Sequence, residues 1–228
     1  MIAAECPWRL LASGGMTEEA GSAEHGAALA ERVVETVRRE PGRSMLSYQH
    51  VPWVAGTSGP MPADALAEAV FPSGRPLPPS LRAWLGFDTS LLERFGWFAP
   101  GGGFSPRPLD RLVGEEMGGH WGEFFAPLAD RFAECFLLPG GSDSRRVLAV
   151  GEPDSRGEYP VLAVDVDDLP FVGLMYPGFD VYLAHTAGLV HRDFPSYTAL
   201  AGDAVYGPRM REHCAHWFAG DVCAEFPF

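Results

Sequence analysis

Three aspartates stand close together between two apolar runs of the chain. They are Asp165, Asp167 and Asp168, in the segment AVDVDDLPFV. Carboxylate oxygens are the ligands that Mg²⁺, Mn²⁺ and Ca²⁺ prefer, so this cluster could serve a metal-dependent hydrolase or transferase. The same residues also suit a tight turn, because Asp accepts hydrogen bonds from the backbone that follows it and Pro170 fixes its own φ. We favour the turn of a hairpin, in which Asp165 and Asp167 share one face.

The acidic residues of this part of the chain extend beyond the triplet. Six carboxylates fall within seventeen residues, and only Arg156 offsets them. Such a run is most often a solvated face whose charges discourage the strand ends from pairing with other chains. An acidic sheet edge can also attract and orient a basic protein. The hypothesis of a partner-binding face therefore rests on Glu152, Asp154, Glu158, Asp165, Asp167 and Asp168.

A second group of potential ligands lies near the end of the chain. His213 and His216 are three residues apart, with Cys214 between them and Cys223 nearby. A zinc site would need two such pairs at closer, regular spacing, so we expect one packed and one exposed histidine. The glycines at 101–103 are not followed by the lysine of a phosphate-binding loop. We therefore predict no catalytic residue, no metal and no cofactor, and a protein that is not an enzyme.

The overall charge limits the class of partner. The formal net charge is −13, and all seventeen basic residues are arginines. The resulting negative field repels nucleic-acid phosphates and anionic membranes and attracts basic partners. Direct binding to nucleic acid is thereby disfavoured.

The expected compartment follows from the cysteines and the first residues. The four cysteines form no CxxC pair, and no run of eighteen apolar residues predicts a membrane span. Glu5 and Pro7 stand where a secretory signal would have a basic end and an apolar run. We expect a cytoplasmic protein with reduced thiols.

The first part of the chain predicts mainly helices. Residues 1–21, rich in Gly, Ala and Glu, predict a loose lead-in to one domain over 22–228. A helix is predicted over 22–40, where Ala and Val recur on one stripe, and Pro41-Gly42 ends it. Pro78 and Pro79 predict the start of a further helix.

The C-terminal half predicts a sheet. Residues 145–152, 159–166 and 171–176 are short apolar runs separated by Gly, Pro and Asp, which is typical of an antiparallel meander. Helical spacing returns over 179–190 and 208–219, whereas the period of the aromatic-rich segment 121–141 does not separate helix from strand. The fold class is therefore α+β, with a mainly antiparallel central sheet flanked by helices in a single domain.

Two stretches carry a family resemblance. PLPPSLRAWLGFD (76–88) resembles the Leu-Pro-x-x-Tyr-x-x-Phe-Leu segment of the SUKH superfamily, which contains cell-wall-assembly-regulator-like and bacterial toxin-immunity proteins. The segment 151–189 is similar to the later strand pair and closing helix of that superfamily, and the likeness spans residues 62–200 with gaps. It implies an α+β domain and a non-catalytic immunity protein that blocks a cognate toxin, often a nuclease or a deaminase.

Three functional hypotheses follow. The first is a cytoplasmic immunity protein that neutralises a basic toxin domain by stoichiometric occlusion. The second is a metal-dependent hydrolase or transferase that uses Asp165, Asp167 and Asp168. The third is a housekeeping protein-interaction adaptor.

Overall fold

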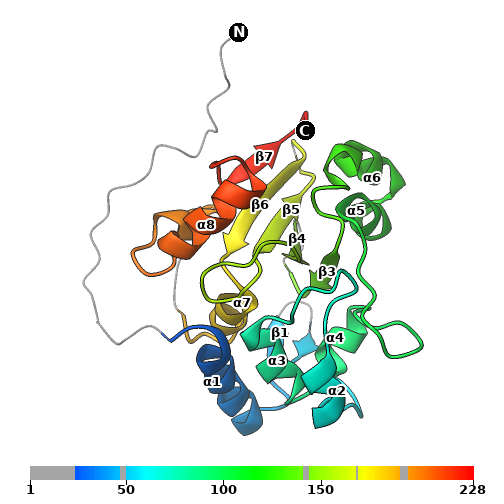
Figure 1. Ribbon diagram of the computed structural model, residues 1–228, viewed down its shortest axis with the longest axis vertical. Coiled ribbons are helices and arrows are strands. Elements are labelled where there is room, and N and C mark those ends of the chain that lie inside the picture. The colour runs from blue at the N-terminus through cyan, green and yellow to red at the C-terminus, as the bar shows by residue number, and fades with distance from the viewer. Residues whose placement is uncertain (1–23, 47–49, 141–143, 168, 191–194) are drawn as a thin grey trace.

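An antiparallel five-stranded sheet forms the centre of the molecule, with helices packed around it (Figure 1). The computed structural model describes residues 24–46, 50–140, 144–167, 169–190 and 195–228. The strands lie side by side in chain order, which makes the sheet a meander. They are β3 (Cys135–Leu138), β4 (Ser144–Ala149), β5 (Val161–Asp165), β6 (Phe171–Tyr176) and β7 (Cys223–Glu225).

The predicted α+β class and the meander are confirmed. The three apolar runs form β4, β5 and β6, and Val147, Leu162 and Val172 on them are fully buried. Two further strands extend the sheet at its edges. β3 comes from the aromatic-rich segment whose period was ambiguous, and β7 is a three-residue strand near the C-terminus, where no period is visible.

The register of the sheet places four residues in one row. Ser144 pairs with Asp165, Asp165 with Phe171, and Phe171 with Glu225. Partners in adjacent strands project to the same face of a sheet. The β5–β6 turn and the end of β7 therefore meet at one end of the sheet, beside the C-terminus in Figure 1.

Most helices precede the sheet in the chain. The described part of the chain also contains a small hairpin of β1 (Ser44–Leu46) and β2 (Val51–Pro52). No described helix is both long and apolar enough to cross a bilayer. The helices are α1 (Gly26–Arg39), α2 (Ala63–Glu68), α3 (Pro79–Leu85), α4 (Ser90–Arg94), α5 (Leu109–Met117), α6 (Gly119–Phe125), α7 (Phe179–Thr186) and α8 (Gly207–Trp217), with 3₁₀ turns η1 (Ala126–Leu128) and η2 (Ala199–Gly202).

The helix predicted over 22–40 is found as α1, which begins at Gly26 and ends at Arg39, just before Pro41. Its predicted stripe is largely correct, since Ala30, Val34 and Val37 are buried. The lead-in 1–21 lies outside the described residues. The helix predicted at Pro79 is confirmed as α3.

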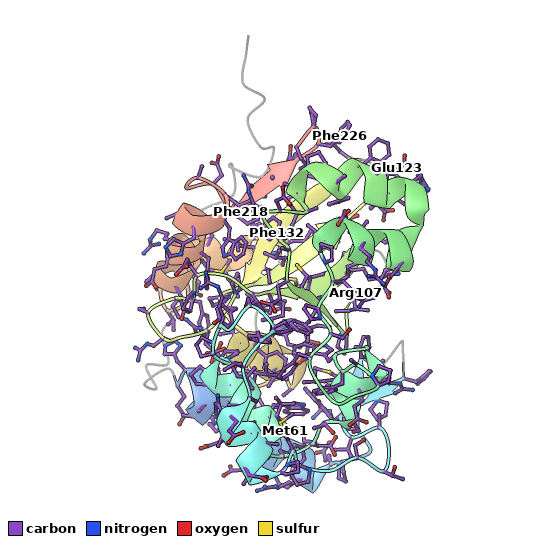
Figure 2. All side chains as sticks on the ribbon, turned by 45° about the vertical axis from the view of Figure 1, so that its right-hand side comes forward. Met61, Arg107, Glu123, Phe132, Phe218 and Phe226 are labelled. Atoms are coloured by element: carbon purple, nitrogen blue, oxygen red, sulfur yellow. The ribbon has the colours of Figure 1, made fainter. Side chains whose placement is uncertain are left out.

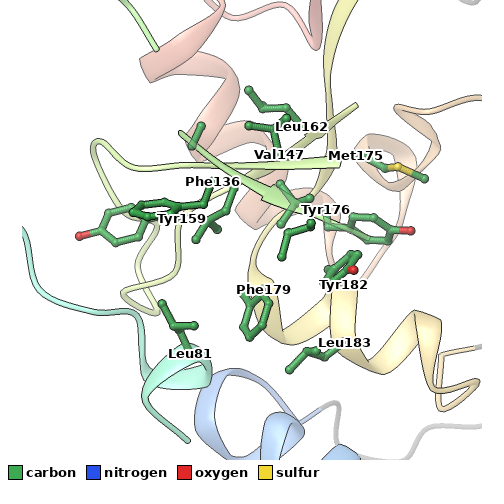
Figure 3. Packing of buried hydrophobic residues seen from close by; sticks show 14 of the residues in the cluster. Leu81, Phe136, Val147, Tyr159, Leu162, Met175, Tyr176, Phe179, Tyr182 and Leu183 are labelled. Carbon is green, nitrogen blue, oxygen red and sulfur yellow. The ribbon is translucent and has the colours of Figure 1, made fainter. Parts of the chain in front are cut away.

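The main core lies between the sheet and helices α1, α3 and α7. α1 packs against α3 and α7, and α7 packs against β6. Figure 3 shows Leu81 of α3 and Phe179 of α7 below the sheet. Phe136 of β3 lies on the same side. All three are at most 1% exposed. Burial of these side chains fixes the start of α7, which carries part of the site described below.

Two glycines bring α5 and α6 together. A Cβ on Gly122 would lie 2.7 Å from the Asp110 carbonyl oxygen and 3.1 Å from the Gly114 Cα. Real Cβ atoms do not approach backbone this closely, so only glycine fits at this crossing. The close packing fixes the position of α6 beside the sheet.

Candidate functional site

Asp165, at the end of β5, and Asp167 belong to the polar turn that leads to β6. Asp165 Oδ1 accepts the Asp167 N–H at 2.8 Å, and Asp165 Oδ2 accepts the Tyr197 hydroxyl at 2.8 Å. Burial and the Asp165 carboxylate raise the pKa of Tyr197, so this phenol stays a donor. The hairpin interpretation is confirmed, and both Asp165 oxygens have donors.

The metal hypothesis finds no further ligands in the described residues. No three or more His, Cys, Asp or Glu side chains gather there in an arrangement that could hold a metal ion. Asp168 lies outside the described residues. Asp167 is exposed.

The predicted acidic face is wrong for two of its members. Asp154 is 5% exposed and Glu158 is fully buried. Neither can contact a partner across this surface, because both point into the protein. Glu152 is exposed and pairs with Arg75 at 2.7 Å, and the hydrogen bond from Arg75 lowers the pKa of Glu152.

The buried acids surround one arginine. Arg209 Nε donates to Asp154 Oδ2 at 2.5 Å, and its two Nη atoms donate to the two oxygens of Asp180 at 2.9 and 3.1 Å. Burial opposes the charge of Arg209, but Asp180 and Asp154 outweigh burial and raise its pKa. We call Asp154, Glu158, Asp180 and Arg209 the Arg209 cluster.

The Arg209 cluster joins four parts of the fold. Asp180 Oδ2 accepts the backbone N–H of Gly26 at 2.7 Å, at the first residue of α1, and Arg209 donates to His25 Nδ1 at 3.2 Å. Asp154 belongs to the β4–β5 connection, Asp180 to α7 and Arg209 to α8. The cluster therefore holds α1, α7, α8 and this connection in one arrangement.

Glu158 extends the cluster to α3. Glu158 Oε1 accepts the Ser80 backbone N–H at 2.8 Å, and the Ser80 hydroxyl donates to Glu158 Oε2 at 2.5 Å. Burial raises the pKa of Glu158 well above its usual range, and the nearby Asp180 raises it further. Protonation of Glu158 removes a like charge beside Asp180 in the interior.

His213 lies against the cluster. Its Nε2 donates to the Pro177 carbonyl at 2.9 Å, which assigns the proton to Nε2, and burial lowers its pKa to about 4 despite the nearby Asp154. His216 is exposed. The prediction of one packed and one exposed histidine is confirmed.

The chemistry of the Arg209 cluster is structural. Its four ionisable side chains are at most 5% exposed, and each carboxyl group accepts hydrogen bonds from arginine, serine or backbone groups. The sequence analysis missed Ser80, Asp180 and Arg209. The one available signal was that Arg209 and His213, four residues apart, flank the apolar stripe of the last helix.

A group of aromatic side chains is exposed at the edge of the sheet. Phe124 of α6 is 39% exposed, and Phe226, directly after β7, is 37% exposed. Their rings meet edge to face at 5.2 Å between centroids. Trp121 contacts Phe124 at 5.6 Å, and Phe228 contacts Phe226 at 6.3 Å. We call Trp121, Phe124, Phe226 and Phe228 the aromatic surface.

The aromatic surface adjoins the β5–β6 turn. The Phe226 N–H donates to the Pro170 carbonyl at 2.9 Å, and Leu169 beside it is 47% exposed. Figure 2 shows Phe226 and Glu123 close together at the top of the molecule. Apolar and acidic side chains thus share this end of the protein.

The comparisons with known proteins bear on neither site. No family model, curated protein or solved structure matches this sequence. The resemblance to the SUKH superfamily therefore stays a prediction from the two segments that carry it.

Proposed function

We propose that this chain is an immunity protein that binds a basic toxin domain in the cytoplasm and blocks it by stoichiometric occlusion. The observation that carries the proposal is the distribution of acidic side chains. Five acids and one arginine are buried among the described residues, and every other described acid is half-buried or exposed. Outside the interior, the described residues carry 19 acids and 14 arginines, a net charge of −5.

Such a surface supports action by contact. An acidic face accelerates the encounter with a positively charged partner and disfavours wrong partners of like charge. The substrate cleft of a nuclease is basic because it holds phosphates. An acidic protein that covers this cleft competes directly with the substrate.

The test is protection of cells. Any small basic domain that a neighbouring gene encodes is expressed with and without this chain. Survival that requires the chain, together with a complex of the two proteins after purification, is the expected result. Death of the cells at equal expression of both proteins, with no complex, contradicts the proposal.

The metal-dependent alternative has its own measurement. Calorimetric titration with magnesium, manganese and calcium gives no saturable heat if the chain acts by contact. Saturable binding that Asp167→Asn removes would favour the metal-dependent alternative. A housekeeping adaptor would instead bind a protein that is not toxic.

A further inference from the structure

The aromatic surface differs from ordinary exposed apolar residues because its members touch one another. Single exposed apolar side chains are common on monomeric proteins, whereas contiguous groups mark interaction sites. The described residues include five exposed large apolar side chains: Val70, Phe124, Leu169, Val205 and Phe226. Phe124 and Phe226 are in contact, and Leu169 belongs to the turn to which Phe226 is hydrogen-bonded.

The rings are held in place from below. Phe125, the neighbour of Phe124, is fully buried and packs against Phe228, with the ring centroids 4.9 Å apart and the rings tilted by 44°. Trp121 is half-buried and supports Phe124. The exposed rings are therefore pre-ordered, so a partner that covers them loses little side-chain entropy on their account.

The surroundings of these rings are acidic. In the three segments that form this end of the protein, 119–125, 165–167 with 169–170, and 223–228, the described residues include four acids and no arginine. Glu123 and Asp167 are exposed. A ring face attracts cations, and flanking carboxylates strengthen this attraction.

We propose that the aromatic surface is the docking site for a basic segment of a partner protein, whose arginine side chains lie over Phe124 and Phe226 and pair with Glu123 and Asp167. This inference rests on the proposed function, since it locates the contact surface of the toxin. Aromatic residues at the centre of an interface carry most of its binding energy, and the charged rim selects the partner.

The charge argues against other occupants. A second copy would bring the four described acids of this end against the same four acids across a two-fold axis, which costs free energy. Nucleic acid and anionic membranes are repelled for the same reason. A basic protein is the occupant whose charge complements this surface.

A defined peptide tests the site without knowledge of the toxin. The full-length chain is titrated into a fluorescein-labelled peptide of alternating arginine and leucine, and the fluorescence anisotropy is recorded. We expect saturable binding that the double variant Phe124→Ala/Phe226→Ala weakens about tenfold or more. The matched control Val70→Ala/Val205→Ala, which removes exposed apolar side chains elsewhere, leaves the affinity unchanged.

A charge variant tests the same site independently, in case the double variant does not fold. Glu123→Arg changes an exposed residue, and it weakens binding of the same peptide about threefold or more at low salt, with a smaller loss at high salt. A peptide in which glutamate replaces arginine does not bind. The proposal is overturned if the wild type, Phe124→Ala/Phe226→Ala and Glu123→Arg bind the basic peptide with equal affinity. It is also overturned if the wild type does not bind this peptide.

Protection in cells separates this inference from the proposed function. If the wild type and the double variant protect equally, the protein is an immunity protein that uses another surface, and the docking site is wrong. If wild type protects no cell but binds the peptide through Phe124 and Phe226, the docking site stands and the toxin proposal fails. Self-association that the double variant abolishes would assign the surface to a second copy and contradict the docking site.

Discussion

Several buried polar contacts converge on Arg209. It donates to both oxygens of Asp180 and to Asp154, and all three side chains are nearly inaccessible to solvent. Removal of one partner from a buried ion pair leaves the other charge unpaired in a medium of low polarity. Loss of Arg209 alone is therefore expected to destabilise the fold strongly, even if the intact ion pair adds little net stability.

Replacement of Arg209 by methionine is expected to lower the free energy of unfolding by about 3–5 kcal/mol. The matched control is Arg211→Met, two residues further along α8, where the arginine is exposed and the expected change is within about 0.5 kcal/mol. Urea unfolding of the two variants and the wild type measures both values. Similar small losses in both variants would show that the Arg209 cluster does not hold the helices together.

Glu158 gives the stability a characteristic pH dependence. Because its folded pKa is raised above the unfolded value, its favourable contribution is complete at low pH and is lost as the pH rises through the folded pKa. The amide of Glu158→Gln carries no charge and can still accept the Ser80 N–H and donate to the Ser80 hydroxyl. The stability of this variant relative to wild type is therefore expected to increase as the pH rises above about 4.3, the unfolded pKa of Glu.

The control for Glu158 is Glu152→Gln. The pKa of Glu152 is lowered by Arg75, so its small contribution is present above the unfolded pKa and lost as the pH falls. The two variants therefore change the pH profile in opposite directions. Thermal unfolding from pH 3 to pH 8 measures the difference, and a Glu158→Gln profile parallel to wild type would show that Glu158 is ionised in the folded protein.

At the scale of elements, the α5–α6 crossing determines where the aromatic surface lies. Trp121 and Phe124 belong to α6, and α6 is set against α5 by the contact of Gly122 with Gly114 and the Asp110 carbonyl. A side chain at Gly122 would push α6 away from α5 and so displace Trp121 and Phe124.

Gly122→Ala is expected to lower the free energy of unfolding by about 1–3 kcal/mol, because the added methyl group overpacks the crossing. Gly119→Ala in the same helix is the matched control, since nothing lies within 4 Å of its Cβ position, and it is expected to leave stability unchanged or slightly increased. Denaturant unfolding gives both values. A Gly122→Ala protein as stable as Gly119→Ala would mean that the helices are further apart than described.

Sequence patterns predicted the elements that follow from local order. The apolar runs of β4, β5 and β6, the prolines before α3 and the turn at Asp165 are signals within a few residues of one another, and each is confirmed. Asp154 and Glu158 were misjudged because a charged residue without a known partner is expected to be exposed. The partner of Asp154 is Arg209, 55 positions away, and no local pattern joins them.

The aromatic surface was also not predicted, because its residues are distant in the sequence. Phe124 appears in a segment whose period is ambiguous, and Phe226 follows a strand of three residues. Only the sheet order, which places β7 beside β6, brings Phe226 to the β5–β6 turn. The acidic turn was recognised from the sequence, whereas the aromatic residues near it required the fold.

At the scale of the whole molecule, the proposed function is to cover another protein. The interior acids and Arg209 stabilise the arrangement of helices, and under this proposal the exposed acids and aromatic rings would contact a partner. The proposed action would then be limited by the number of its molecules, because one copy would occupy one toxin.

The most direct measurement is a titration of toxin activity with the purified chain, at toxin concentrations well above the dissociation constant. Occlusion predicts that activity falls linearly and reaches zero at one molecule of the chain per toxin domain. Complete loss of activity at a small fraction of an equivalent would indicate catalytic inactivation and contradict occlusion, as would full activity in excess chain.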